Sequence, residues 1–280
     1  RMDQLRWFDH WLKGIDTGLM EEPPVKLEIR TGGSKKPYPF RTENEWPLAR
    51  TEWKKLYLKI DREQSQDDTD TEGSMGGDAP AREASVSYSA SGSTAAGVAS
   101  GSSLSTTHGG AGRLGVSFET AAMMADTEIT GPLMLNLWVS STTEDMDIMC
   151  TLRNIGPDGK DVWEVGQHGG PVPLTKGWLR ASHRKLDAAK STPYRPFHPH
   201  NERWWLEPGK PVECQIEIWP TCIVLKKGHK LRLDVQPRDG LGSAPYTHYH
   251  CDYNAGAINT IYAGGDKSSY LLAPFIPAKS

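Results

Sequence analysis

Cysteine is scarce in this sequence, with four residues in a chain of 280. The four are Cys150, Cys214, Cys222 and Cys251, and no two of them form a CxxC pair. A fold held together by disulfides would need more cysteines than this. We therefore expect reduced cysteines, most of them buried as small apolar side chains.

Long apolar runs and an excess of one charge are also missing. No stretch approaches the roughly 20 apolar residues that a membrane-spanning helix requires. A net charge of -3 gives no electrostatic basis for binding nucleic acid. Near the N-terminus the apolar residues are spaced helically and mixed with charge, unlike a secretory signal peptide, so we expect a cytoplasmic protein.

Sequence motifs of catalysis are absent as well. The P-loop, HExxH and the GxSxG nucleophile elbow of serine hydrolases do not occur. The nearest approach to the elbow is "GVSFE" at 115–119, where Glu119 replaces the second glycine. The residues around Ser117 alternate, which is typical of a strand. The sequence therefore predicts no catalytic residue and no cofactor.

An aromatic-rich helix opens the chain at "LRWFDHWLKG", residues 5–14. Its apolar residues recur every three or four positions, and Gly14 stands where a helix usually ends. They are Leu5, Trp7, Phe8, Trp11, Leu12 and Ile15. This is more apolar surface than a free terminal helix usually exposes. The helix must dock either on the rest of this chain or on a partner.

After residue 20 the period of the apolar residues changes to two. Alternation is clear in 25–30, 56–60, 133–139, 148–152, 212–218 and 231–235. Short alternating strands with Gly, Pro and Asp turns predict an all-β antiparallel sandwich behind the one helix. We expect "GPDG" at 156–159 and "KKGH" at 226–229 to be hairpin connections. The predicted core comprises Leu133, Leu135, Leu137, Cys214, Ile216, Ile218, Leu231, Leu233 and Val235.

Residues 65–112 interrupt this pattern, because they are mainly small and polar. Such a composition cannot bury enough apolar area to offset the entropy of ordering. We predict one edge strand at "REASVSY" and otherwise long loops within the sandwich, not a linker between domains. The predicted organisation is a terminal helix over residues 1–20 and one β-sandwich over residues 21–280.

Five residues are candidate ligand or interface positions. His248, His250 and Asp252 lie in "THYHCDYN", where an HxH pair on a strand would point both rings to one side. No further ligand lies at a characteristic spacing, so we expect no metal site there. Adjacent Trp204 and Trp205 would face opposite sides of a strand, and packing alone is the favoured explanation.

Several segments, taken in order, resemble one family of serine hydrolases. They are "LRWFDHWLKGID", "EEPPVKLEIR", "ENEWPLARTEW", "DTEITGPLMLNLWVSS", "IGPDGKD", "GWLRASHRKLD", "KKGHKLRLDVQPRD" and "SSYLLAPFIP". These blocks are similar to the C-terminal region of the CocE/NonD family, which contains cocaine esterase, X-prolyl dipeptidyl peptidase and α-amino acid ester hydrolase. Only the Ser/Gly-rich stretch is left uncovered.

The resemblance implies a jelly-roll β-sandwich of the galactose-binding-like type, following an α/β-hydrolase domain. It implies that the opening helix is the last helix of that domain and that the catalytic triad precedes it. We thus expect the C-terminal domain of an ester or amide hydrolase whose catalytic domain is absent from this chain. Trp7, Phe8, Trp11 and Leu12 would pack on the hydrolase domain or on a second copy.

Two other hypotheses remain open at this point. The chain could be a separate jelly-roll module that binds a small molecule or glycan. It could also be a shortened relative recruited to a different, biosynthetic reaction. No nucleic acid or membrane partner is expected in any of these cases.

Overall fold

A computed structural model describes residues 2–33, 38–60, 72–90, 115–166, 171–237 and 254–277. One α-helix, α1 (Met2–Lys13), and two 3-10 helices, η1 (Leu19–Glu21) and η2 (Ala181–His183), accompany the strands. The strands are β1 (Val25–Glu28), β2 (Phe40–Glu43), β3 (Glu52–Lys59), β4 (Glu72–Gly76), β5 (Ala84–Ser89), β6 (Val116–Thr120), β7 (Thr127–Ser141), β8 (Asp147–Ile155), β9 (Glu164–Val165), β10 (Pro171–Val172), β11 (Thr175–Arg180), β12 (Val212–Leu225), β13 (Lys230–Gln236), β14 (Ile258–Ala263) and β15 (Tyr270–Ile276). The prediction of an all-β chain preceded by one helix is confirmed. Within the described ranges, no helix has the length and apolarity needed to cross a membrane.

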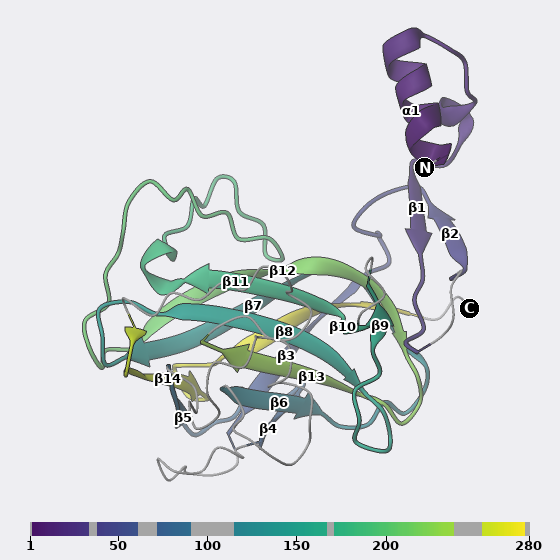
Figure 1. The fold of residues 1–280 in the computed structure, drawn as a ribbon. Helices are drawn as coiled ribbons and strands as arrows, with labels where there is room; N and C mark the ends of the chain where they lie inside the picture. The colour runs from purple at the N-terminus through teal and green to yellow at the C-terminus, as the bar shows by residue number, and fades with distance from the viewer. Residues whose placement is uncertain are drawn as a thin grey trace.

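The strands of the sandwich pair into a closed ring (Figure 1). The order is β12-β11-β8-β13-β6-β4-β3-β15-β7, and β7 returns to pair with β12. Strand β14 pairs with the end of β7, and β5 pairs with β14. The pairings are antiparallel except for β4 with β6, which is parallel. The structure thus differs from two separate antiparallel sheets in being joined along both sides.

The core lies inside this ring. All nine residues predicted for it, from Leu133 to Val235, are 0–1% exposed. Alternate residues of each strand point inward, so a period of two places one set of side chains together in the interior. The predicted core is confirmed. Cys150 and Cys214 are free and buried, as expected, while Cys222 is free and half-buried.

An ionic network is buried on the opposite face of β6, β8 and β13. The Asp234 carboxylate forms an ion pair with Arg153, whose Nε lies 2.6 Å away, and accepts a hydrogen bond from Arg232 Nε at 2.7 Å. Ser117 Oγ donates to the same carboxylate at 2.7 Å. Burial alone would raise the pKa of Asp234, but the two guanidinium charges and the Ser117 hydroxyl lower it below its usual value. Ser117 is therefore a structural strand residue.

The hairpin β1–β2 forms an arm that carries α1 away from the ring (Figure 1). Leu27, Ile29, Leu48 and Ile276 form a separate small core at the base of this arm. Arg41 of β2 makes a bidentate pair with Glu128 of β7 at 2.8 and 2.6 Å. The arm is therefore fixed to the ring by both apolar and ionic contacts.

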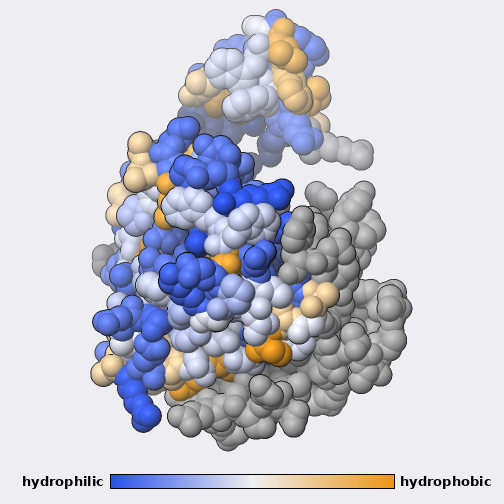
Figure 2. Space-filling model, turned by 90° about the vertical axis from the view of Figure 1, so that its left-hand side faces the viewer, coloured by the Kyte–Doolittle hydropathy of each residue, from blue (hydrophilic) through white to orange (hydrophobic). Residues whose placement is uncertain are grey.

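Helix α1 stands at the far end of the arm and buries none of its residues. It ends as predicted, because Gly14 adopts a left-handed conformation (φ 68) and its N–H donates to the His10 carbonyl at 3.2 Å. Figure 2 shows apolar side chains on this helical end, which is separated from the body of the molecule. In this structure α1 therefore buries no residue against the sandwich.

Two local predictions are corrected by the topology. "KKGH" at 226–229 is a turn between β12 and β13, but these strands do not pair, so it is not a hairpin. β4 is a strand inside the segment predicted to contain only one, whereas β5 lies at the edge as expected. "GPDG" does form a tight turn, in which Gly156 N donates to the Lys160 carbonyl at 2.8 Å. The rest of the Ser/Gly-rich segment falls mainly on 61–71 and 91–114, outside the described residues.

Candidate functional site

A cavity of about 420 Å³ lies on the outer face of β8, β11 and β12. Strand residues form its floor, and the segment that connects β11 to β12 supplies the remaining wall. The lining consists of Asp147, Met149, Gly177, Trp178, Leu179, Arg180, His183, His198, His200, Glu217 and Trp219. The combination of exposed aromatic rings with charged groups and imidazoles makes this cavity the main candidate for ligand binding.

The aromatic end of the cavity is built by the pairing of β11 with β12. Gly177 lies opposite Ile218, so the next residue, Trp178, lies opposite Glu217. A Cβ at Gly177 would stand 2.4 Å from the Glu217 carbonyl oxygen, which means that only glycine allows this close approach. Trp219 follows Glu217 on the same face, and its ring centroid is 5.3 Å from that of Trp178, tilted by 57°. The two rings and one carboxylate therefore share a corner.

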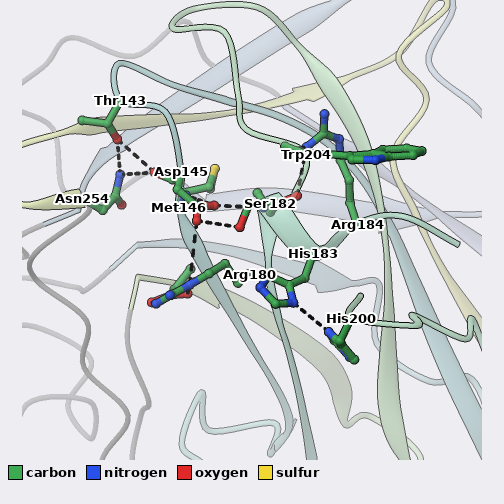
Figure 3. A network of polar contacts seen from close by, with 12 residues as sticks. Thr143, Asp145, Met146, Arg180, Ser182, His183, Arg184, His200, Trp204 and Asn254 are labelled. Carbon is green, nitrogen blue, oxygen red and sulfur yellow. Dashed lines mark hydrogen bonds and ion pairs between the residues drawn. The ribbon is translucent and has the colours of Figure 1, made fainter. Parts of the chain in front are cut away.

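The polar end is organised by two buried aspartates. Asp147 makes a bidentate pair with Arg180, at 2.8 and 3.1 Å, across β8 and β11. Asp145 accepts from the backbone N–H of Ser182 at 2.9 Å and from its hydroxyl at 2.7 Å (Figure 3). These bonds fix η2, the turn on which His183 stands. The position of the first imidazole is thus set by a fully buried carboxylate.

Three histidines from the connecting segment complete the wall. The Nδ1 atoms of His183 and His200 are 2.8 Å apart, so one ring donates to the other (Figure 3). His200 has a positive φ of 53, which is uncommon for a residue other than glycine and often marks functional sites. Burial, followed by the neighbouring His183 and His198, lowers the pKa of His200. His200 is therefore a neutral imidazole near pH 7.

His198 is held differently from the other two. Its Nδ1 lies 3.0 Å from the Lys185 carbonyl oxygen and its Nε2 lies 2.9 Å from the Gln215 carbonyl oxygen. Both ring nitrogens are thereby occupied by backbone contacts and do not form a ligand set with the other imidazoles. Among the residues that the structure describes, no group of His, Cys, Asp or Glu is arranged to hold a metal ion.

The sequence-predicted tryptophans lie beside this cavity but do not line it. Trp204 N donates to the Ser182 carbonyl at 2.7 Å, and Arg184 stands 5.7 Å from its ring centroid. Trp205 stacks under Arg203 at 5.5 Å. Both tryptophans are nearly half exposed. His248, His250 and Asp252 lie outside the described residues.

Sequence reasoning missed Trp178, Trp219 and the three histidines of the cavity. They come from "GWLRASHR", "PFHPHN" and "EIWP", each of which has an unremarkable spacing on its own. Only the order of the strands brings these segments together. A useful signal was the exposed tryptophan at an outward position of an otherwise alternating strand, as Trp219 is after Ile216 and Ile218.

Helix α1 is a second candidate surface. The expected interface residues Trp7, Phe8, Trp11 and Leu12 are 52%, 55%, 55% and 76% exposed. The rings of Trp7 and Trp11 lie 5.9 Å apart and present one aromatic face. This arrangement provides an apolar surface for another protein surface but no reactive group.

Comparison with known proteins places these features in context. The family described as "X-Pro dipeptidyl-peptidase C-terminal non-catalytic domain" matches residues 17–272. Proteins of Mycobacterium bovis and Mycobacterium tuberculosis, each named as a candidate serine esterase, are 25% identical to this chain over 246 residues. The match covers 84% of this chain and 35% of each relative. The chain thus spans about a third of the length of the curated relatives it matches.

Solved structures show the same fold. A CocE/NonD family hydrolase from Staphylococcus aureus superposes with a TM-score of 0.78 at 24% identity, covering 98% of this chain and 45% of that one. An α-amino acid ester hydrolase gives a TM-score of 0.62 at 17% identity, covering 97% of this chain and 44% of that one. At these identities the likeness establishes the fold alone, and more than half of each neighbour lies outside it.

Proposed function

Because this chain belongs to the family of X-Pro dipeptidyl-peptidase C-terminal non-catalytic domains, we propose that it serves a serine hydrolase acting on esters or amides. The catalytic serine, acid and histidine would then lie in a separate α/β-hydrolase domain. Acyl transfer requires a nucleophile, a base and oxyanion donors within hydrogen-bond reach of one another. The sequence of this chain contains no GxSxG elbow that would begin such an arrangement.

The observation that carries this proposal is the exposed apolar face of α1. Burying one large apolar side chain is worth about 1.5–3 kcal/mol. Six such side chains on α1 are at least half exposed, so the helix can still bury apolar surface against a partner. The catalytic domain is the occupant we propose, because the matched solved structures carry more than half of their length outside the region similar to this chain.

The anchoring of the arm supports the same assignment. Arg30, which follows β1, bridges to Ile223 of β12, and its N–H donates to the Cys222 carbonyl at 3.2 Å. Arg6 of α1 donates to Glu22 at 2.6 Å and to the Thr17 carbonyl at 3.1 Å. A surface held by such contacts needs little further ordering when its partner binds.

We also propose that the sandwich is of the jelly-roll type, related to galactose-binding domains. Successive strands β5, β6, β7 and β8 alternate between opposite parts of the ring, which supports this assignment. Connections that cross between sheets are typical of double Greek-key sandwiches.

The test of the hydrolase proposal compares this chain with a longer form that includes the coding sequence upstream of residue 1. We expect a GxSxG motif upstream, and we expect a fluorophosphonate probe to label that serine stoichiometrically. The 280-residue chain alone should show neither labelling nor turnover of an activated ester. Labelling of one serine within this chain, or an upstream sequence without the motif, would contradict the proposal.

A further inference from the structure

The corner formed by Trp178, Glu217 and Trp219 has the chemistry of a cation site. The two indole rings are 43% and 61% exposed, which is unusual for tryptophan on the face of a strand. Their centroids lie 5.3 Å apart and their planes meet at 57°, so the rings form two walls. Indole rings have a negative π face, and tryptophan is the strongest of the aromatic residues in attracting cations.

Two carboxylates line the cavity, Asp147 and Glu217, and only Glu217 can pair with a bound cation at this corner. Asp147 is neutralised by its bidentate pair with Arg180. No hydrogen bond or ion pair joins the side chain of Glu217 to the rest of the described chain, although it is half-buried. Lys176 neighbours Trp219 across the strand pair but is not part of the cavity lining. The lining therefore favours a positive ligand.

Among the described residues of the opposite wall, no imidazole is bonded to Glu217. His183 and His200 satisfy one another through their Nδ1 atoms, 2.8 Å apart, and the lowered pKa of His200 keeps that ring neutral. Both nitrogens of His198 are directed at backbone carbonyl oxygens. Met149 contributes a polarizable apolar surface to the floor.

We propose that this cavity binds a small organic cation, an alkylammonium or guanidinium group, between the tryptophan rings and the Glu217 carboxylate. The carboxylate supplies the counter-charge, and the ring faces attract the apolar, weakly hydrated surface of such an ion. A cavity of about 420 Å³ has room for a group of this kind. The ligand can be a free small molecule or a basic side chain presented by another protein surface.

The test is a calorimetric titration of the intact 280-residue chain. One titration uses choline and the other uses its uncharged isostere, 3,3-dimethylbutan-1-ol. The two compounds have the same shape, so any difference reports the charge. We expect saturable binding of choline, and about tenfold weaker binding of the isostere. A parallel titration with N-acetylarginine methylamide distinguishes a free small molecule from a basic side chain of another protein. If this compound binds more tightly than choline does, a basic side chain is the natural occupant.

Substitutions test whether the bound cation contacts Glu217 and Trp219. Glu217→Gln and Trp219→Leu should each weaken cation binding about tenfold, whereas Trp205→Leu, an exposed tryptophan outside the cavity, should leave it unchanged. Trp219 is 61% exposed, so its replacement should not alter thermal unfolding, which serves as the control for folding. Equal binding of choline and its isostere, no binding of either cation up to high millimolar concentration, or full retention of binding in Trp219→Leu would overturn the proposal.

Discussion

The ring of strands and helix α1 use apolar side chains in opposite ways. Leu233 and Ile216 of the ring are 0% exposed, while Phe8 and Leu12 of α1 are 55% and 76% exposed. The ring obtains its hydrophobic stabilisation from contacts within this chain. The helix can obtain the same free energy only from a second surface. This difference in exposure separates the apolar residues that stabilise the fold from those that can bind another protein surface.

Charged side chains show a similar contrast. Asp234 is buried between two guanidinium groups, whereas Asp126 pairs with Lys226 at 2.8 Å on the surface. Removing one member of a buried network leaves other charges uncompensated, while a surface pair contributes little. The following predictions use these contrasts, beginning with the largest expected effect.

Asp234→Asn should lower the free energy of unfolding by about 3–5 kcal/mol, because Arg153 and Arg232 would remain buried without their shared carboxylate. Denaturant unfolding of the purified chain measures the change. Asp126→Asn is the matched control on the surface and should have little effect. A similar small loss in both variants would show that the buried network is not important for stability.

Leu233→Ala should cost about 2–5 kcal/mol, since the side chain is fully buried and its removal leaves a cavity. Leu12→Ala makes the same chemical change on α1 and should alter the stability of the isolated chain by about 0.5 kcal/mol or less. The same denaturant assay compares the two. Comparable losses would mean that α1 packs against the ring in solution.

Acid should destabilise the sandwich through Asp234 and Glu128. Burial raises the pKa of Glu128, but hydrogen bonds from Arg41 and the charges of Arg41 and Arg50 lower it overall, and the pKa of Asp234 is also lowered. A folded-state pKa below the unfolded value gives stability that is present above about pH 4–5 and is lost as the pH falls further. Asp161, whose pKa is raised chiefly by burial, acts in the opposite direction.

Denaturant midpoints measured from neutral pH downward test this dependence. The free energy of unfolding should decline through the acidic range, and Glu128→Gln should make the decline shallower. A profile that is flat, or one in which the variant declines as steeply as the unmodified chain, would contradict the assignment.

Without a catalytic domain to cover α1, we expect the isolated chain to associate through this helix. Deletion of residues 1–18 should abolish that association and should have the smallest effect on stability. None of the residues of α1 is buried, so the thermal midpoint should hardly change. Sedimentation of both forms measures association. If both forms are monomers and the deletion strongly lowers the midpoint, α1 belongs to the sandwich and the proposed docking surface is wrong.

The sequence by itself determined where α1 and the strongly alternating strands occur, and which residues of those strands are internal. Alternation in 212–218 and 231–235 predicted the strands and the inward side of each, since the direction of a side chain depends on the local backbone. The end of α1 was equally local, because Gly14 only has to adopt a left-handed conformation.

Only the tertiary structure decided which strands are neighbours, and with that the candidate site. A period of two shows which side of a strand is buried but not which strand lies beside it. This is why the sequence predicts a hairpin at "KKGH" that the structure does not form. It is also why β4 escapes prediction: Gly73 lies closely against Phe118, and "EGSMG" has no alternating apolar pattern of its own. Trp178 and Trp219 are 41 positions apart in sequence and meet only because β11 pairs with β12. Such pairing depends on long-range packing of the whole ring, which no short segment encodes.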